Sequence, residues 1–142
     1  MNILLAIDGS DCAHRAVSHL IEHLAPALRQ APTIHLLHVH SPIPIGRVQA
    51  HIGHETLERY YREEGEALLQ PVAARLTAAN LKVVEHIHVG DPSTLIAKLA
   101  KELTCDWIVM GSHGRSAVSA VLLGSVATKV QHLSERPVLL VK

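Results

Sequence analysis

Five short apolar runs alternate with segments of helical period, and this alternation constrains the fold more than any other feature. The runs cover residues 3–7, 33–40, 81–89, 106–110 and 137–141. The first is continuously apolar, which is typical of a strand that is covered on both faces. Strands that alternate with helices predict an α/β fold with a parallel sheet and helices on both faces. Right-handed crossovers then favour a doubly wound order such as 3-2-1-4-5.

The helical segments carry recognisable start and stop signals. Residues 8–11 supply a turn and a helix N-cap, and Pro26 is expected to kink or end the helix that follows. Asp91 is expected to cap a third helix with Pro92 at its first position, and a fourth helix is predicted over 125–133. Apolar residues at helical spacing define the first helix: Val17, Leu20, Ile21, Leu24 and Leu28.

The second helix contains a local conflict. Its apolar positions predict a long helix, but Gly65 and Pro71 lie within it and both disfavour a helix interior. The preceding residues 41–54 hold several prolines and glycines without periodicity, and are therefore expected to form a long loop. The positions that support the helix are Leu57, Tyr61, Leu68, Val72 and Leu76.

Size and charge limit the classes of function. The 142 residues fit one domain, 1–142, and 48% of them are hydrophobic. Lys plus Arg and Asp plus Glu both number 13, so the formal net charge is zero and neither nucleic acid nor a membrane surface is an expected partner. The chain shows no signal peptide and no run long enough to span a bilayer. Its two cysteines give no disulfide framework, so we expect a cytoplasmic protein.

A glycine-rich run over residues 111–125 carries the main functional signal. It follows a predicted strand and leads into a predicted helix, with glycines at 111, 114 and 124 and a serine at 125. Glycines allow the backbone to approach a ligand closely, and a helix N-terminus offers unpaired N–H groups and the positive end of a dipole. The run therefore suits a phosphate. It matches neither the P-loop nor the common dinucleotide fingerprint.

Asp8 is predicted to face this run across one crevice. In a doubly wound sheet, ligands bind beyond the carboxyl ends of the strands where the winding reverses. For order 3-2-1-4-5 that point lies between the first and fourth strands, which end at Asp8 and Gly111. Two segments far apart in the sequence thus converge on one site. Taken alone, Asp8 is equally explained as a helix-capping carboxylate.

The spacing Gly111, two residues, Gly114, nine residues, Gly124-Ser125 resembles the nucleotide-binding signature of the universal stress protein family. The resemblance covers essentially the whole chain, including residues 3–10, 37–39, 89–92, 106–114 and 137–141. It implies a Rossmann-like fold of the adenine nucleotide alpha hydrolase type and an ATP-binding member of that family. The implied function is a nucleotide-dependent regulatory module of the stress response, with at most slow ATPase activity.

The resemblance also implies where ATP would lie. Asp8 would be near the adenosine, and the backbone around Val39 would meet the adenine edge. Ala6 stands where some members carry a proline beside the adenine, with Ile7 next to it. The residues implied around the ribose and phosphates, with their flanking candidates, are Met110, Gly111, His113, Gly114, Gly124, Ser125 and Val126.

Metal and catalytic chemistry have weaker support in the sequence. Twelve histidines include His35, His38 and His40 on one predicted strand and His86 and His88 on its neighbour, so a cross-strand metal site is geometrically conceivable. No zinc motif supports it, and scattered histidines are the simpler interpretation. An Mg²⁺ or Mn²⁺ ion bridging bound phosphates is favoured instead. We identify no catalytic constellation in the sequence.

The last strand is apolar, terminal and predicted at a sheet edge, which invites pairing with another chain. A homodimer through residues 137–141 is the expected outcome, and the resemblance implies the same. Two alternatives to an ATP-binding regulator stay open. One is a nucleotide-free dimeric stress protein, and the other is an enzyme that hydrolyses or transfers from an adenine nucleotide.

Overall fold

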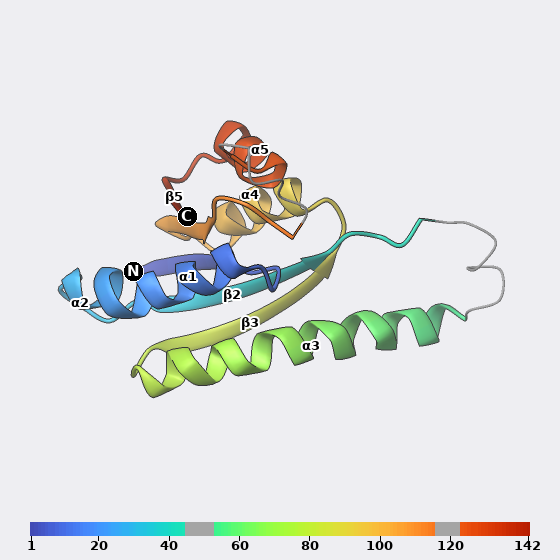
Figure 1. Cartoon of the computed structure of the whole chain (residues 1–142), viewed down its shortest axis with the longest axis horizontal. Helices are drawn as coiled ribbons and strands as arrows, with labels where there is room; N and C mark the ends of the chain where they lie inside the picture. Colours follow the sequence, from blue (N-terminus) through green and yellow to red (C-terminus); the bar gives the residue numbers. More distant parts are fainter. Residues whose placement is uncertain (45–52, 116–122) are drawn as a thin grey trace.

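All five strands of the described residues pair in parallel in one sheet of order β3-β2-β1-β4-β5 (Figure 1). The structure is a computed structural model that describes residues 1–44, 53–115 and 123–142. The predicted order is confirmed. Most of the predicted loop 41–54 and part of the glycine-rich run lie outside the described residues. The strands are β1 (Asn2–Ala6), β2 (Thr33–His40), β3 (Lys82–Val89), β4 (Trp107–Gly111) and β5 (Val138–Val141).

Helices cover both faces of the sheet, as predicted. On one face α1 and α3 pack on a core that includes Ile3 and Leu5, and on the other α4 and α5 pack on a core that includes Leu4 and Ala6 (Figure 1). Successive β1 side chains point to opposite faces, and the four buried positions from Ile3 to Ala6 are all apolar. The helices are α1 (Asp11–His19), α2 (Ala25–Ala27), α3 (His54–Ala78), α4 (Pro92–Glu102) and α5 (Ser125–Leu133).

The first helical segment continues to Ala27 through one π-helical turn, η1 (Leu20–Leu24). Ala25 N–H donates to the Leu20 carbonyl, five residues back. Pro26 follows this wide turn, and the backbone becomes extended at Leu28. Because proline lacks an N–H and its ring crowds the preceding turn, the helix ends close to Pro26, as expected. Leu28, which we predicted within the helix, lies just beyond it.

Strand boundaries agree with the prediction to within one residue. β1 covers 2–6 rather than 3–7, and β4 covers 107–111 rather than 106–110. β2 and α5 have the predicted bounds. Asp91 caps α4 by accepting the Thr94 N–H at 2.9 Å, with Pro92 at the first helical position. Hydrogen bonding to Thr94 also lowers the pKa of the Asp91 carboxyl.

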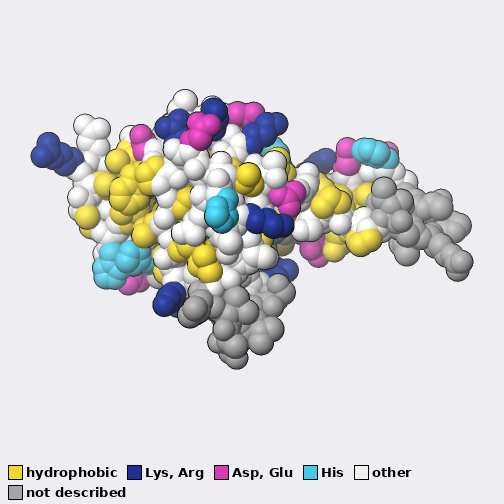
Figure 2. All heavy atoms as spheres, turned by 90° about the horizontal axis from the view of Figure 1, so that it is seen from above, with side chains coloured by type: hydrophobic (Ala, Val, Ile, Leu, Met, Phe, Trp, Pro, Cys, Tyr) yellow, Lys and Arg dark blue, Asp and Glu magenta, His cyan; other side chains and the backbone are white. Residues whose placement is uncertain are grey.

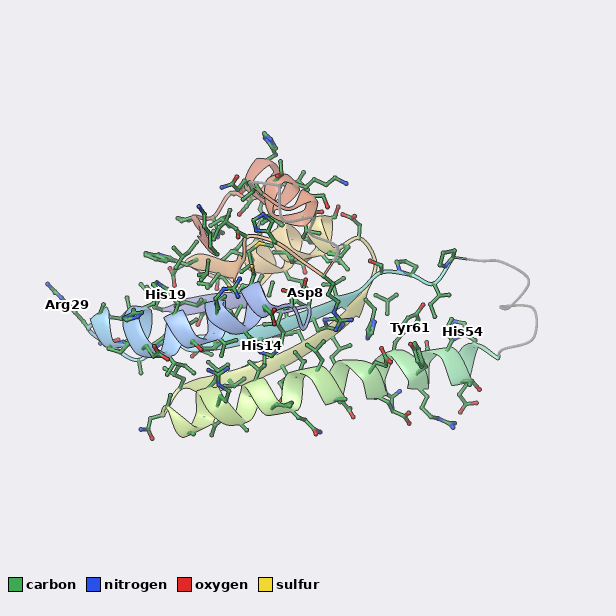
Figure 3. All side chains as sticks on the ribbon, in the orientation of Figure 1. Asp8, His14, His19, Arg29, His54 and Tyr61 are labelled. Atoms are coloured by element: carbon green, nitrogen blue, oxygen red, sulfur yellow. The ribbon has the colours of Figure 1, made fainter. Side chains whose placement is uncertain are left out.

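The conflict in the second helix is resolved by packing. A Cβ on Gly65 would lie 2.8 Å from Cγ2 of Ile87 on β3, so glycine allows α3 to approach the sheet closely. Pro71 is exposed and α3 continues through it. Figure 3 shows α3 extending past the strand ends, with His54 and Tyr61 on its N-terminal half. There the Tyr61 hydroxyl accepts the Ile43 N–H at 3.0 Å and attaches the segment that follows β2.

Charge is mixed over the surface, and none of the described helices is long and apolar enough to cross a membrane. Figure 2 shows the face seen from above, where Lys and Arg side chains are interspersed with Asp and Glu side chains. This agrees with the formal net charge of zero. This face therefore carries no field of a single sign.

Two substitutions that both raise the helix propensity of α3 should change stability in opposite directions. Pro71→Ala restores a helix donor at an exposed site, and we expect it to raise the free energy of unfolding by about 1–3 kcal/mol. Gly65→Ala gains about 1 kcal/mol of propensity but forces a methyl group into Ile87, at a cost of about 1–3 kcal/mol. Urea unfolding measures both variants, and Gly65→Ala is repeated in an Ile87→Ala background. If Gly65→Ala stabilises the unmodified protein, the close contact does not govern this position.

Candidate functional site

A cavity of about 560 Å³ opens at the carboxyl ends of β1, β2 and β4 and at the start of α5. This volume lies within the range of small-molecule sites, about 300–1,000 Å³. The cavity occupies the place where the winding of the sheet reverses. Every predicted site residue lines it: Ala6, Ile7, Asp8, Val39, Met110, Gly111, His113, Gly114, Gly124, Ser125 and Val126.

Pairing of β1 with β4 brings the two predicted segments together. Ala6 is the register partner of Met110, so Asp8 and Gly114 leave the sheet side by side. A Cβ on Gly114 would lie 2.9 Å from Oδ2 of Asp8. The glycine loop and the carboxylate thus face one crevice, as the sheet order predicted.

Ser10, and not Asp8, caps helix α1. The Ser10 hydroxyl accepts the Ala13 N–H at 3.2 Å, while Asp8 Oδ1 accepts the Ser10 N–H at 2.9 Å and fixes the turn. Asp8 lies two residues too early to reach the orphan N–H groups of the helix, so the interpretation of Asp8 as a helix cap is wrong. Its other oxygen, Oδ2, accepts no hydrogen bond from the described residues and is available to a ligand.

Two of the loop glycines are required by close packing. A Cβ on Gly111 would lie 2.8 Å from the carbonyl carbon of Cys12, because the first turn of α1 crosses the end of β4. A Cβ on Gly124 would lie 3.0 Å from the Ser112 carbonyl oxygen, which accepts the Gly124 N–H at 2.8 Å. The main chain therefore leaves the sheet at Ser112 and returns to the same place at Gly124.

The N-terminus of α5 faces the cavity without a side-chain cap. Its N-cap residue is Gly124, which has no side chain to accept a hydrogen bond. The first intrahelical bond at this end runs from the Thr128 N–H to the Gly124 carbonyl at 3.0 Å. The preceding N–H groups, on Ser125, Val126 and Ala127, have no acceptor within the helix, and all three residues line the cavity. This arrangement suits an anion.

The side chains of β2 divide the cavity into an apolar and a polar part. Leu37 and Val39 pack with the core beneath α4, together with Ala6 and Met110, and form an apolar floor. His38 points to the opposite face and donates from Nδ1 to the Ile7 carbonyl at 2.9 Å. His40 follows on that face, with its ring centroid 4.4 Å from that of His38. The apolar floor suits a flat base, and the histidines form a polar wall.

The polar wall was missed by the sequence reasoning, as were Glu64 and Arg115, which also line the cavity. Burial lowers the pKa of His40, and His38 lowers it further, against an opposing effect of Glu64. The His40 Nε2 atom is buried without a hydrogen-bond partner in the described residues. A side chain on Gly9, whose φ is +78°, would collide with the Arg115 guanidinium. The alternation of side chains between the two faces of β2 could have identified the histidines, because one face of the carboxyl end of this strand had to meet the site.

Ser112 and His113 do not form an accessible nucleophile and base. The Ser112 hydroxyl lies 2.8 Å from Nδ1 of His113, but Ser112 is only 2% exposed. Ser112 lines the cavity but presents little surface to it. Among the described residues, no group of three or more His, Cys, Asp or Glu side chains is placed to hold a metal ion.

Comparison with known proteins gives a consistent result. A model of the universal stress protein family matches residues 1–142. The universal stress protein YxiE of Bacillus subtilis is 32% identical over 148 residues, with 99% of this chain and 97% of the relative covered. The solved structure of protein MJ0577, from Methanocaldococcus jannaschii, superposes with a TM-score of 0.86 at 33% identity, over 99% of this chain and 94% of the other. A universal stress protein solved in complex with cAMP superposes at 0.71 with 25% identity, over 100% and 97%.

Acidification should destabilise the protein partly through His40. Because the pKa of His40 is lowered on folding, the folded state binds fewer protons than the unfolded state below pH about 6.5. The stabilisation is present above that pH and is lost as the pH falls toward the lower folded pKa. Urea midpoints at pH 7.5 and 5.5 should therefore differ less in His40→Gln than in the unmodified protein. His132→Gln, which removes an exposed histidine, is the control. An equal fall in the urea midpoint of all three proteins between pH 7.5 and 5.5 would contradict the role of His40.

Proposed function

The chain belongs to the universal stress protein family, and on that premise we propose that it is a cytoplasmic ATP-binding regulatory module. The observation that carries the proposal is the uncapped N-terminus of α5, which faces a cavity whose opposite wall holds Asp8. An anion and a hydroxyl-bearing group can both be satisfied across this one space. The family member solved with cAMP supports an adenine nucleotide as the ligand.

Each part of a nucleotide has a matching surface. The apolar floor of Ala6, Val39 and Met110 suits adenine, with Ile7 beside it. The Oδ2 atom of Asp8, which accepts no hydrogen bond from the described residues, would accept ribose hydroxyls. The phosphates fit the N–H groups at the start of α5 and the backbone of the loop that brings Gly111, His113 and Gly114 to the cavity. Mg²⁺ or Mn²⁺ would bridge phosphate oxygens and take few protein ligands, which agrees with the residues present.

Two features support binding without rapid turnover. The loop has no lysine at the P-loop position, and the serine that follows β4, Ser112, is only 2% exposed. We therefore propose at most slow hydrolysis of ATP, with the bound nucleotide altering the surface offered to partners. We expect ATP to order the segments 41–54 and 112–123, whose described residues Ser41 and 112–115 line the cavity.

Ser125→Glu tests the phosphate site while preserving the helix. A carboxylate at the first position of α5 interacts favourably with the helix dipole, by about 0.3–1 kcal/mol, so the fold should be unchanged or slightly stabilised. The same carboxylate repels a triphosphate. We expect ATP affinity, measured by calorimetry with Mg²⁺, to fall by about tenfold or more, which corresponds to about 1.4 kcal/mol.

Gln131→Glu is the matched control. It adds the same charge to an exposed position of the same helix, away from the cavity. ATP affinity should be nearly unchanged in this variant. No heat of binding at millimolar ATP in the unmodified protein would exclude the proposed function, and an equal loss in both variants would show only a general effect of charge.

We further propose a homodimer that forms through β5. This strand pairs with β4 on one side only and lies at the edge of the sheet. Its four residues are apolar and half-buried, and an open apolar edge is satisfied by pairing with a second copy. Light scattering after gel filtration should give the mass of two chains. A single-chain mass at micromolar concentration would contradict this arrangement.

A further inference from the structure

Two histidine rings meet on the sheet outside the nucleotide cavity. His35 on β2 is the register partner of Val84, and His86 on β3 is the partner of Leu37, so the two histidines lie diagonally on the same face. Nδ1 of His35 is 3.0 Å from Nε2 of His86, and their ring centroids are 5.2 Å apart. Both side chains are half-buried. Neither residue lines the cavity.

The 3.0 Å separation fits two arrangements. It is the length of an N–H···N hydrogen bond between neutral imidazoles. It is also the separation of two nitrogens on one metal ion, since metal–nitrogen bonds of about 2.0–2.1 Å at angles of about 90–109° place the nitrogens about 2.8–3.4 Å apart. The separation of the nitrogens therefore already fits a shared cation, and the rings would tilt to point both lone pairs at the ion.

The surroundings favour neutral rings, the form that binds metal. Burial lowers the pKa of both histidines, with a further contribution from Lys82 at His35 and from His35 and His88 at His86. The Lys82 ammonium opposes a cation, and no third His, Cys, Asp or Glu of the described residues joins the pair. The nearby ammonium and the lack of a third ligand limit the affinity for the metal ion. The remaining coordination positions of the ion would be open to water.

We propose that His35 and His86 form an exchangeable two-histidine site for a borderline divalent transition-metal ion. Imidazole nitrogen suits Cu²⁺, Ni²⁺ and Zn²⁺, with Cu²⁺ bound most tightly. The ion would bridge β2 to β3, the strand at the open edge of the sheet. Because it binds the folded state, it would stabilise the protein in proportion to its concentration over its dissociation constant. The site is independent of the proposed nucleotide function.

The test uses the full chain without nucleotide, titrated with CuCl₂ and ZnCl₂ at pH 7.5. Thermal unfolding should shift upward with each metal, and more with copper. His35→Gln and His86→Gln should each reduce the calorimetric affinity by about tenfold or more. The matched control is His19→Gln with His23→Gln, which removes another neighbouring ring pair, whose centroids are 5.1 Å apart on the first helical segment. This control should keep the shift.

Electron paramagnetic resonance of the copper complex of the unmodified protein identifies the ligands directly. The expected spectrum shows hyperfine coupling to two imidazole nitrogens, and it should be lost in His35→Gln and in His86→Gln. A protein whose melting temperature does not respond to either metal would overturn the proposal. Retention of binding in both single variants, or its loss in the His19–His23 control, would place the metal elsewhere and also overturn it.

Discussion

Burial of β1 on both faces is the constraint on which the rest of the structure depends. Ile3, Leu4 and Leu5 are fully buried, alternately beneath α1 and α4, and each such side chain contributes about 1.5–3 kcal/mol. A strand this apolar must lie at the centre, with β2 on one side and β4 on the other. That position makes the winding reverse at its end. The cavity, Asp8 and the glycine loop all occupy the space that this reversal leaves.

The glycines of the loop show how a ligand signature can also be a packing signature. Gly111 is required because the backbone of α1 crosses it, and Gly124 because the main chain returns against Ser112. Neither constraint involves a phosphate. The close packing nevertheless places the start of α5 beside the end of β4, which is the geometry that an anion needs. The same small residues therefore serve the fold and the proposed function together.

Strand order and site position could be predicted from the sequence because both follow from local patterns. Apolar runs locate the strands, and the order then places residue 8 opposite residue 111 before any contact is known. What could not be predicted depends on contacts between distant elements. The place of Gly65 within a helix could not be explained from the sequence, because it depends on the close contact with Ile87 of β3. The roles of His38 and His40 depend on which face of β2 meets α3. Whether Asp8 or Ser10 caps α1 depends on the path of the backbone, which places the Ser10 hydroxyl at the cap.

The hydrogen bond between Gly124 and Ser112 has a consequence for how the family can diversify. It holds the two ends of the intervening segment together, with the Gly124 nitrogen 2.8 Å from the Ser112 carbonyl oxygen. With its ends held, the segment can change length at little thermodynamic cost, since each doubling of a loop adds only about 0.6 kcal/mol of closure entropy. The packing that places the start of α5 beside the end of β4 therefore does not itself fix the length of the segment between Ser112 and Gly124.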